Sequence, residues 1–492
     1  MRNYIGIDLG TSSVKILLVD EEGKILKTAT RDYPLIFPNP GWTEQEPELW
    51  WNATLEALEE LLSGTDRTLV DGIGVGGQMH GLVILDRQDR VIRPAILWND
   101  GRTGEEVEYL NSVIGKEKIS ECTANIAFAG FTAPKLLWLK KHEKENFERI
   151  SKIMLPKDYI NYLLTGVHSC DYSDASGMLL LDVKNRRWSE EMLKICSVRE
   201  DQMPSLYESY QVTGTLKKEV AQKLGLRKEV CVTAGAGDNA AAAVGTGTTG
   251  DGECNISLGT SGTLFITSDK FRVDNNNGLH AFCHADGKYH LMGCMLSSAS
   301  CNKWFYEEIL KTDDYNAEQA GITDRMLGNN RVFFLPYLMG ERSPINDTDA
   351  RGTFTGLSMD TTRTDMVLSI LEGVAFAARD NLEIVKKLGI DVKKSKICGG
   401  GARSRLWVKI LANVLGIELE IPQTEEGPGY GAAMLSMVGC GRYKSVKEAC
   451  DNLIKTVGTV YPDREISQRY EKAYGKYRKI YPALKNVFPE LK

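Results

Sequence analysis

The stretch IDLGTSSVKILLVD at residues 7–20 returns as ISLGTSGTLFITSD at residues 256–269, so one short pattern opens each half of the 492-residue chain. In both copies, apolar residues in strand spacing flank a Gly-Thr-Ser turn, which is the pattern of a β-hairpin. A repeat at half the chain length predicts two related halves. We therefore expect an N-terminal domain at residues 1–247 and a C-terminal domain at residues 248–492.

The two Gly-Thr-Ser turns are candidate phosphate-binding loops. Glycine leaves backbone N–H groups uncovered, and the neighbouring hydroxyls add further donors for an anion. The copies differ in charge, because Asp8 corresponds to Ser257 and Lys15 corresponds to Leu264. A carboxylate at a strand end beside a phosphate is a typical partner of Mg²⁺ or its bound water. The first copy is therefore expected to have a role that the second lacks, and a plain hairpin turn without a ligand is the alternative.

Strand-like and helix-like segments alternate along the rest of the chain, which is typical of an α/β fold. A helical pattern at 50–62 precedes an apolar strand at 70–75, and a helical pattern at 406–415 precedes a strand at 417–421. Near the C-terminus, tyrosines recur at helical spacing, which indicates packing rather than chemistry. They are Tyr470, Tyr474, Tyr477 and Tyr481.

Composition argues against several classes of protein. With 42% hydrophobic and 26% charged residues, the chain is typical of globular proteins, and a net charge of −6 without a dense Lys/Arg run argues against nucleic acid as a partner. No apolar run is long enough to span a bilayer, and a strand pattern begins too close to Met1 for a signal peptide. The 11 cysteines form no Cys-x-x-Cys pair and are expected to be reduced. We expect a cytoplasmic protein with no membrane partner, and the sequence is compatible with a homodimer.

The segment VCVTAGAGDNAAAAV at residues 230–244 predicts a strand, a glycine turn and a helix that begins at Asp238. The carboxylate has three possible interpretations. It can cap the helix, it can lie within a dinucleotide-binding fingerprint at Gly235-x-Gly237-x-x-Ala240, or it can project into a site and accept a proton from a hydroxyl. A carboxylate at the helix N-terminus would repel a pyrophosphate, which disfavours the second interpretation.

Two further segments suggest a polar pocket and its support. The sequence GGQMHG at residues 76–81 follows a strand, and its glycines create an open turn around Gln78, Met79 and His80. The sequence WNDGR at residues 98–102 offers an aspartate and an arginine that pair as readily with each other as with a ligand. We interpret the second segment as supporting structure.

Glycines near the C-terminus suggest where a nucleotide would lie. The sequence GGGARSR at residues 399–405 precedes the predicted helix at 406–415, and its bare backbone suits a flat ring or a ribose. A tight strand-to-helix turn is the structural alternative. We expect EGPGYGA at residues 426–432 to form a second loop on the same rim.

The chain has no Gly-x-x-x-x-Gly-Lys-Ser/Thr loop, but its paired hairpins resemble the two phosphate loops of the actin-like, ribonuclease H-like ATPases. Within that fold it resembles the FGGY family of carbohydrate kinases over about residues 3–440, and among these the xylulokinases most. The motifs occur in the family's order: QMHG at 78–81, WNDGR at 98–102, FTAPK at 131–135, LPKDY at 155–159, GDN at 237–239, LGTSG at 258–262, GER at 340–342 and GGGARS at 399–404. Glycerol kinases have an Arg-Glu pair in place of Met79 and His80.

The resemblance implies a two-domain actin-like α/β fold with an interdomain cleft and the ATP-dependent phosphorylation of a ketopentose, D-xylulose, to D-xylulose 5-phosphate. It implies that Asp238 is the general base and that Asp8 assists at the phosphate and binds Mg²⁺ through water. The residues implied for the sugar are Gln78, Met79, His80, Asp238 and Asn239. Those implied for ATP are Thr11, Ser12, Ser13, Lys15, Gly259, Thr260, Ser261, Gly400, Gly401, Ala402 and Arg405.

The chain departs from the family pattern at two places: Ser13 stands where glycine is common, and the sequence GYG at residues 429–431 replaces the expected Ala-Leu. Three other functions stay open. The enzyme can act on another polyol or sugar acid of the family, such as ribulose or gluconate. A non-kinase actin-like ATPase would have both loops but no sugar site, and a nicotinamide-dependent oxidoreductase would bind NAD at the glycine turn before Asp238.

Overall fold

The computed structural model describes residues 2–424 and 426–491, and it divides into two compact units. The first unit contains residues 2–249, 281–290 and 426–454, and the second contains residues 250–280, 291–424 and 455–491. The expected domain boundary after residue 247 lies close to the first break between the units, which falls after residue 249. However, two segments of the expected C-terminal domain pack in the first unit, because they are buried against its sheet and helices. Packing therefore does not divide the chain into two continuous halves.

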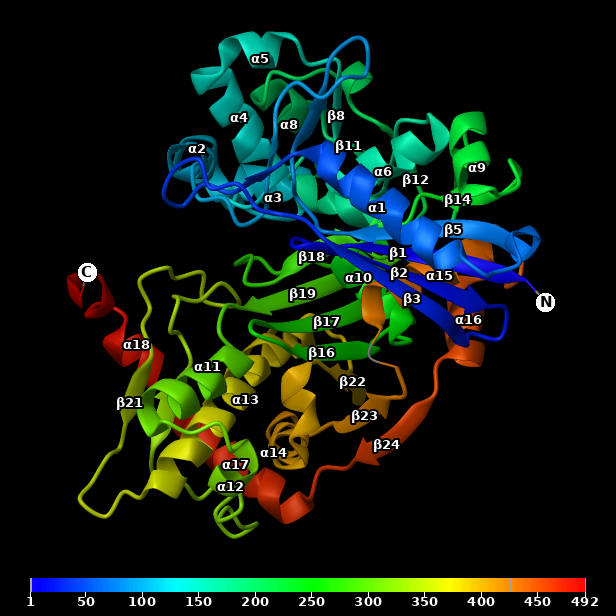
Figure 1. Ribbon diagram of the computed structural model, residues 1–492. Helices are drawn as coiled ribbons and strands as arrows, with labels where there is room; N and C mark the ends of the chain where they lie inside the picture. The colour runs from blue at the N-terminus through cyan, green and yellow to red at the C-terminus, as the bar shows by residue number, and fades with distance from the viewer. Residues whose placement is uncertain (1, 425, 492) are drawn as a thin grey trace. The chain divides into compact units, whose positions relative to one another are not determined.

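A mixed sheet of seven strands forms the centre of the first unit (Figure 1). Strand β1 pairs antiparallel with β2 and parallel with β5, so the predicted first hairpin is confirmed. The short strand β15 (Ala236–Gly237) pairs with β5. The other six strands run in the order β13 (Val212–Thr215), β14 (Cys231–Thr233), β5 (Val70–Gly77), β1 (Asn3–Leu9), β2 (Ser13–Asp20) and β3 (Ile25–Asp32).

Helices cover both faces of this sheet. Helix α1 (Pro47–Leu62), which confirms the helical pattern at 50–62, packs on β2 and β3. Ile5 and Ile7 of β1 face the same core as α1, whereas Tyr4 and Leu17 face the core of α10 (Asp238–Gly245) and α15 (Gly427–Gly439). Since neighbouring residues of a strand point to opposite faces, α1 and α15 cover opposite sides of the sheet.

Shorter elements complete the first unit. They are β4 (Glu44–Gln45), β6 (Val83–Leu85), β7 (Ala95–Ile96), α2 (Gly104–Glu108), a π-helix (Tyr109–Gly115), α3 (Lys116–Thr123), α4 (Thr132–His142), α5 (Lys144–Glu148), β8 (Lys152–Met154), α6 (Pro156–Thr165), β9 (Ser169–Asp171), α7 (Tyr172–Ala175), β10 (Leu181–Asp182), β11 (Arg187–Trp188), α8 (Glu190–Ile195), β12 (Ser205–Tyr207), α9 (Lys218–Leu224) and α16 (Val446–Leu453).

Helix α15 approaches its neighbours backbone to backbone. A Cβ atom on Gly6 of β1 would lie 1.9 Å from the carbonyl oxygen of Gly429, and a Cβ atom on Gly431 would lie 1.9 Å from the carbonyl oxygen of Ala241 in α10. The prediction of a loop at residues 426–432 is therefore wrong, because these glycines lie at the start of helix α15. They allow contacts that no residue with a side chain could make.

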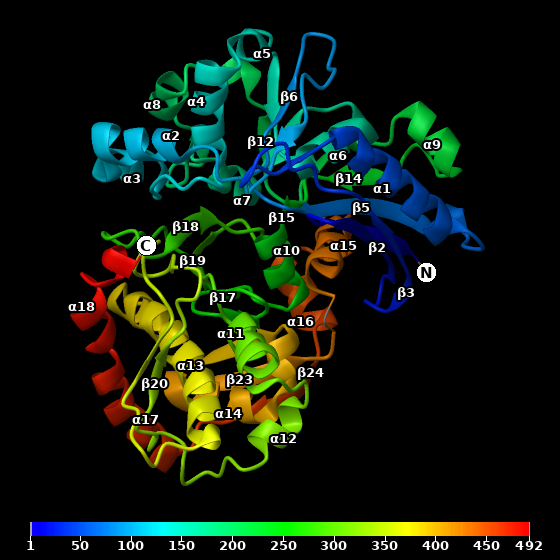
Figure 2. The same ribbon diagram turned by 60° about the vertical axis from the view of Figure 1, so that its left-hand side comes forward.

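The second unit repeats the arrangement around the hairpin (Figure 2). Strands β16 and β17 form the predicted second hairpin, and β22 runs parallel to β16 as β5 runs parallel to β1. In the first hairpin Asp8 lies opposite Lys15, whereas in the second Ser257 lies opposite Thr263. The sheet that contains this hairpin also includes part of the segment 281–290, which is counted above with the first unit. It runs in the order β18 (His280–Cys283), β19 (Tyr289–Met295), β17 (Gly262–Ser268), β16 (Cys254–Leu258), β22 (Lys394–Cys398), β23 (Glu418–Pro422) and β24 (Thr456–Val460).

Three long helices pack against one another in the second unit, and they are α13 (Arg363–Lys387), α14 (Arg405–Leu415) and α17 (Arg464–Tyr477). The shorter elements are α11 (Ala299–Trp304), a π-helix (Phe305–Leu310), α12 (Tyr315–Gln319), β20 (Phe333–Leu335), β21 (Thr353–Thr355) and α18 (Ile480–Leu484). All 11 cysteines are free thiols. Among the helices in the described ranges, none combines the length and the apolar character needed to cross a bilayer.

The close approach of α15 to α10 predicts that Gly431→Ala destabilises the protein. The added methyl group would overlap the backbone of Ala241, and we expect the free energy of unfolding to fall by about 3 kcal/mol because two backbones must separate. Gly475→Ala in α17 is the matched control, since its methyl group meets nothing within 4 Å. The control should gain about 0.5–1 kcal/mol. Urea denaturation followed by circular dichroism measures both, and equal stability of the two variants would contradict the packing.

Candidate functional site

The first Gly-Thr-Ser turn is held by three side chains of the first unit. The Tyr33 hydroxyl donates to the carbonyl oxygen of Gly10 at 2.6 Å, and Gln45 Nε2 donates to the carbonyl oxygen of Thr11 at 2.7 Å. The Trp98 indole N–H donates to the Thr11 hydroxyl at 3.0 Å. These contacts fix the conformation of the turn, and neither Tyr33 nor Gln45 was expected from the sequence to take part.

Asp8 lies in a crowded group of charges next to this turn. Its neighbour across the hairpin is Lys15, whose Nζ lies 2.5 Å from the carboxylate of Glu426. Burial, aided by the negative charges of Asp238 and Glu426 and opposed by Lys15, raises the pKa of Asp8 to about 7. Asp8 is thus an aspartate that a nearby cation would stabilise in its ionised form.

Asp238 is the first residue of α10, as the sequence predicts, but it is not the helix cap. The capping position is Gly237, and one oxygen of Asp238 accepts hydrogen bonds from the backbone N and the side-chain Nδ2 of Asn239 at 2.7 and 2.9 Å. Burial raises the pKa of Asp238 to about 6, although the bonds from Asn239 oppose the rise. The residue is half-buried. A carboxylate that titrates near neutral pH is suited to accept and return a proton.

Met79 and His80 follow β5 and lie beside the start of α10. A Cβ atom on Gly237 would lie 3.0 Å from the sulfur of Met79, so this side chain packs against the residue that precedes Asp238. The ring of His80 stacks on Phe131 with 4.6 Å between centroids, and its Nδ1 lies 2.7 Å from the carbonyl oxygen of Gly177. Because a carbonyl only accepts, Nδ1 carries the proton and Nε2 carries the lone pair of the neutral ring.

Gln78 connects this group to the first turn. Its backbone N donates to the carbonyl oxygen of Leu9 at 2.8 Å, and its Nε2 lies 3.2 Å from Oε1 of Gln45. Its own Oε1 is buried and has no hydrogen-bond partner among the described residues. The parallel strands β1 and β5 end at the same edge of the sheet, so the first unit brings together Asp8, Thr11, Ser12, Ser13, Lys15, Gln78, Met79, His80, Asp238 and Asn239.

The structure confirms the supporting interpretation of residues 98–102. The guanidinium of Arg102 is fully buried, lies 2.7 Å from both the Asp100 and Glu44 carboxylates, and stacks over the ring of Trp42 at 3.9 Å. Asp100 also accepts a hydrogen bond from the backbone N of Thr43 at 2.5 Å. The charged groups of Asp100 and Arg102 are both paired within the protein, so this segment stabilises the neighbouring loops.

The second Gly-Thr-Ser turn lies in the second unit, with the side chains of Thr260 and Ser261 exposed. Its backbone is held from behind, because the N–H groups of Ser298 and Ala299 donate to the carbonyl oxygens of Thr260 and Gly259 at 3.0 and 2.9 Å. The sequence analysis missed this support. Its only signal was LSSAS at residues 296–300, a run of small hydroxyl residues after a strand.

Three serine hydroxyls of the same run are further candidates for the site. Ser297, Ser298 and Ser300 have side-chain oxygens that are buried and without a hydrogen-bond partner in the part of the chain that the structure describes. Buried hydroxyls usually have partners. Their position behind the second turn makes them candidates to contact a polar ligand.

The glycine segment after β22 adjoins this turn. Gly399 has φ of 86°, and a Cβ atom on it would lie 2.7 Å from the backbone of Leu258, the residue before the turn. Gly400 is exposed, and a Cβ atom on it would meet nothing within 4 Å. The second unit therefore brings Gly259, Thr260 and Ser261 next to Gly400, Gly401 and Ala402. Arg405 is the exposed first residue of α14.

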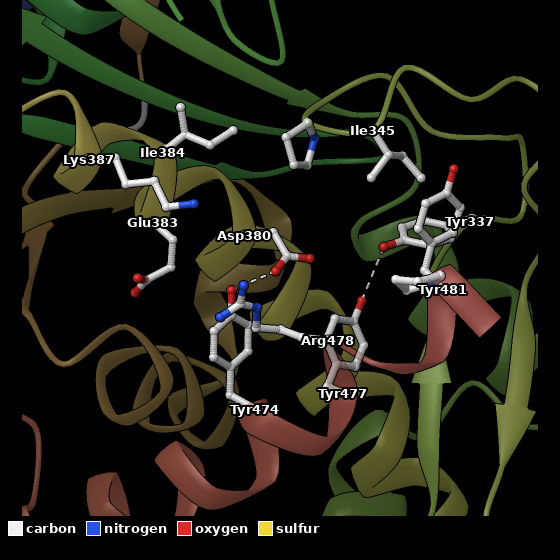
Figure 3. Close-up of a pocket in the computed structure, with 12 residues that line it drawn as sticks. Tyr337, Ile345, Asp380, Glu383, Ile384, Lys387, Tyr474, Tyr477, Arg478 and Tyr481 are labelled. Atoms are coloured by element: carbon white, nitrogen blue, oxygen red, sulfur yellow. Dashed lines mark hydrogen bonds between the residues drawn. The ribbon is translucent and has the colours of Figure 1, made fainter. Parts of the chain in front are cut away.

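A separate surface cavity of about 230 Å³ lies between α13 and α17 (Figure 3). Tyr474 donates a hydrogen bond to Asp380 at 2.6 Å in its wall, and the rings of Tyr474 and Tyr477 lie 6.0 and 4.9 Å from that of Phe376. The packing role predicted for the tyrosine stripe is confirmed. The cavity includes none of the predicted site residues.

Comparison with family models covers most of the chain. The model of the N-terminal domain of the FGGY family of carbohydrate kinases matches residues 3–245, and the model of its C-terminal domain matches residues 254–440. The gap between the two matches includes the expected boundary at residue 247.

Full-length proteins are similar to the chain as well. A xylulose kinase of Escherichia coli (strain K12) is 41% identical over 98% of this chain and 99% of its own length. The crystal structure of a xyloylose kinase from Brucella ovis has a TM-score of 0.93 at 39% identity and covers 99% of this chain and 100% of that one. The crystal structure of a gluconate kinase from Lactobacillus acidophilus has a TM-score of 0.94 at 25% identity, with 100% of both chains covered.

These matches cover both hairpins and the strands that run parallel to them. They confirm the two-domain α/β fold and the carbohydrate phosphotransferase class expected from the sequence. The chain belongs to the FGGY family of carbohydrate kinases.

Proposed function

We propose that the protein transfers the γ-phosphoryl group of ATP to D-xylulose and forms D-xylulose 5-phosphate. The observation that carries this proposal is the position of Asp238 at the start of α10, with Met79 packed against the preceding residue, Gly237, and with Met79 and His80 both against Gly177. The similarity to full-length xylulose kinases supports this sugar over other polyols. We place the reaction in the cytoplasm, as expected from the sequence.

In the proposed reaction, Asp238 accepts the proton of the primary hydroxyl of the sugar while the hydroxyl oxygen bonds to the γ-phosphorus and the bond to ADP breaks. A pKa of about 6 leaves the carboxylate ionised at neutral pH. Asn239 orients the carboxylate through two hydrogen bonds. His80, whose Nδ1 lies 2.7 Å from the carbonyl oxygen of Gly177, is assigned to the sugar hydroxyls. Gln78 and Met79 complete the sugar site.

Each unit contains residues that the sequence assigns to ATP. Thr11, Ser12 and Ser13 of the first turn and Gly259, Thr260 and Ser261 of the second are assigned to the phosphates. Gly400, Gly401 and Ala402 are assigned to the adenosine, with Arg405 nearby. Lys15 is assigned to the phosphates as well, and its ion pair with Glu426 partly neutralises its positive charge. Phosphoryl transfer needs little covalent help from the protein, so alignment by these groups is their main contribution.

The residues near Asp8 are compatible with a bound Mg²⁺ ion. Throughout residues 2–424 and 426–491, no three His, Cys, Asp or Glu side chains are grouped so as to hold a metal ion by themselves. Mg²⁺ bound with a nucleotide typically uses one or two carboxylates, and water and phosphate oxygens supply the rest. Asp8 is therefore assigned as a ligand through water, and the ion would supply positive charge to the phosphates.

The substrate assignment predicts a selective response to sugars. We expect purified protein with Mg·ATP to release ADP with a kcat/KM for D-xylulose at least about 10-fold above that for L-ribulose, D-ribulose, gluconate or glycerol. A sugar with a missing or inverted hydroxyl leaves a polar group of the site unpaired, which costs about 1–3 kcal/mol. Coupled detection of ADP measures the panel, with a sample without sugar as the control. A higher kcat/KM for gluconate or ribulose would assign a different substrate to the enzyme. No ADP release with any sugar would refute the proposal.

The role of Asp238 predicts that Asp238→Asn lowers kcat by about 10²–10⁴-fold, because the amide cannot accept the proton. ATP affinity, measured by calorimetry, should stay within about 2-fold since the residue is assigned to the sugar side. Asp451→Asn on the exposed face of α16 is the matched control and should have wild-type kinetics. Wild-type turnover of Asp238→Asn would exclude this residue as the base.

The same role predicts a pH dependence. The base works in its ionised form, so kcat/KM for the sugar should fall as the pH drops through about 6, the pKa of Asp238. The decrease should reach about 10-fold per pH unit at lower pH. Initial rates between pH 4.5 and 8, with protein stability checked at each pH, measure it. A flat profile down to pH 4.5 would contradict the assignment.

A further inference from the structure

A buried hydrogen-bond network holds the residues that lead into Asp238. The carbonyl oxygen of Ala234 accepts a hydrogen bond from Asn161 Nδ2 at 2.7 Å. The N–H of Gly235 donates to the carbonyl oxygen of Ser209 at 2.9 Å. These bonds position the beginning of the segment at residues 234–237, whose last two residues form β15.

The last residue of the segment depends on one hydroxyl. The backbone N–H of Gly237 donates to Oγ of Ser173 at 3.2 Å, and Ser173 Oγ in turn donates to Oδ2 of Asp171 at 2.6 Å. The backbone N of Ser173 donates to the same oxygen at 2.8 Å, as does the Ser209 hydroxyl at 2.7 Å. Ser173 is thus both a donor to a buried carboxylate and the acceptor for the residue before Asp238.

A buried lysine forms an ion pair with this carboxylate, and it also lies within 3.7 Å of the buried Asp174 carboxylate. Nζ of Lys157 lies 3.0 Å from Oδ1 of Asp171 and 2.6 Å from the carboxylate of Asp158, and the three side chains are fully buried. The same Nζ also donates to the carbonyl oxygen of Ala234 at 3.3 Å. A buried carboxylate without a cation is strongly unfavourable, so Lys157 allows Asp171 to act as a charged acceptor that fixes the Ser173 hydroxyl.

This contact is important because α10 has no capping side chain of its own. Its capping residue, Gly237, cannot supply one, and Asp238 at the next position bonds to Asn239. The position of the first residue of α10 therefore depends on the hydrogen bonds made by residues 234–237. Misplacement of a catalytic group by about 1 Å can reduce a rate by 10²-fold.

We propose that Ser173 is a positioning residue for Asp238, and that Asp171 and Lys157 hold its hydroxyl in place. The proposal rests on the role of Asp238 as the base in the proposed function. Ser173 acts through the backbone of Gly237, so its loss should affect turnover rather than nucleotide binding.

The test compares three buried serines in the first unit. Ser173→Ala removes the acceptor of Gly237, whereas Ser209→Ala removes only a donor to the same oxygen of Asp171. Ser436→Ala in α15 removes a buried hydroxyl that donates to Ala433. We expect Ser173→Ala to lower kcat at least about 10-fold with KM for ATP within 2-fold, because misalignment affects transfer. Ser436→Ala should keep wild-type kcat, and Ser209→Ala should lose clearly less than Ser173→Ala.

The conservative variant Ser173→Thr keeps the hydroxyl and should recover most of the lost turnover. If Ser173→Ala is insoluble, Ser173→Cys replaces it, since sulfur is a weak acceptor of similar size. Wild-type kcat in Ser173→Ala, or an equal loss in Ser209→Ala, would overturn the proposal, because the contact with Gly237 would then not be the cause.

Amide hydrogen exchange separates this proposal from the proposed function. Ser173→Ala should accelerate exchange in a peptide that covers residues 230–240, and Ser436→Ala should leave it unchanged. If the wild-type protein phosphorylates no sugar, the proposed function fails, and the exchange result still decides whether Ser173 holds the segment. Unchanged exchange at residues 230–240 would refute the positioning role independently of activity.

Discussion

The backbone contact between α15 and its neighbours is the constraint on which the first unit depends. Glycines let the helix approach β1 and α10 so closely that a single methyl group at Gly6 or Gly431 would overlap main-chain atoms. This contact covers one face of the central sheet and supports α10, whose first residue is Asp238. It also brings Glu426, the residue before the helix, to Lys15. The main charges of the candidate site therefore depend on a close backbone contact that only glycines allow, together with the apolar side chains packed around it.

The two hairpins show how one backbone design serves two purposes. Each consists of an antiparallel pair with a third strand running parallel to its first strand, and each ends in a Gly-Thr-Ser turn held from behind. Charge differs between the copies, because Asp8 and Lys15 are replaced by Ser257 and Leu264. Ionised groups that can act on a substrate therefore gather in the first unit, and the second offers hydroxyls and bare backbone.

Local patterns predicted the hairpins, α1, α10 and α14 because strand alternation and helix periodicity depend on neighbouring residues. The start of α15 was missed, since Gly-Pro-Gly is typical of a loop and only contacts with β1 and α10 explain those glycines. The Lys157 network was also missed as a structural unit. Lys157 and Asp158 at the start of a helix look like exposed residues, and Asp171 and Ser173 join them only in the fold. Long-range packing of this kind leaves no local signal.

The position of α15 in the chain also affects the order in which the protein can form during synthesis. The sheet of the first unit is complete by residue 237, but the helix that covers one of its faces ends at residue 439. Until α15 emerges from the ribosome, part of the apolar face of this sheet, which α10 alone does not cover, stays exposed. Such surfaces favour aggregation and attract chaperones. The glycine contacts that arrange the charged groups thus delay completion of the first unit until nearly the whole chain has emerged.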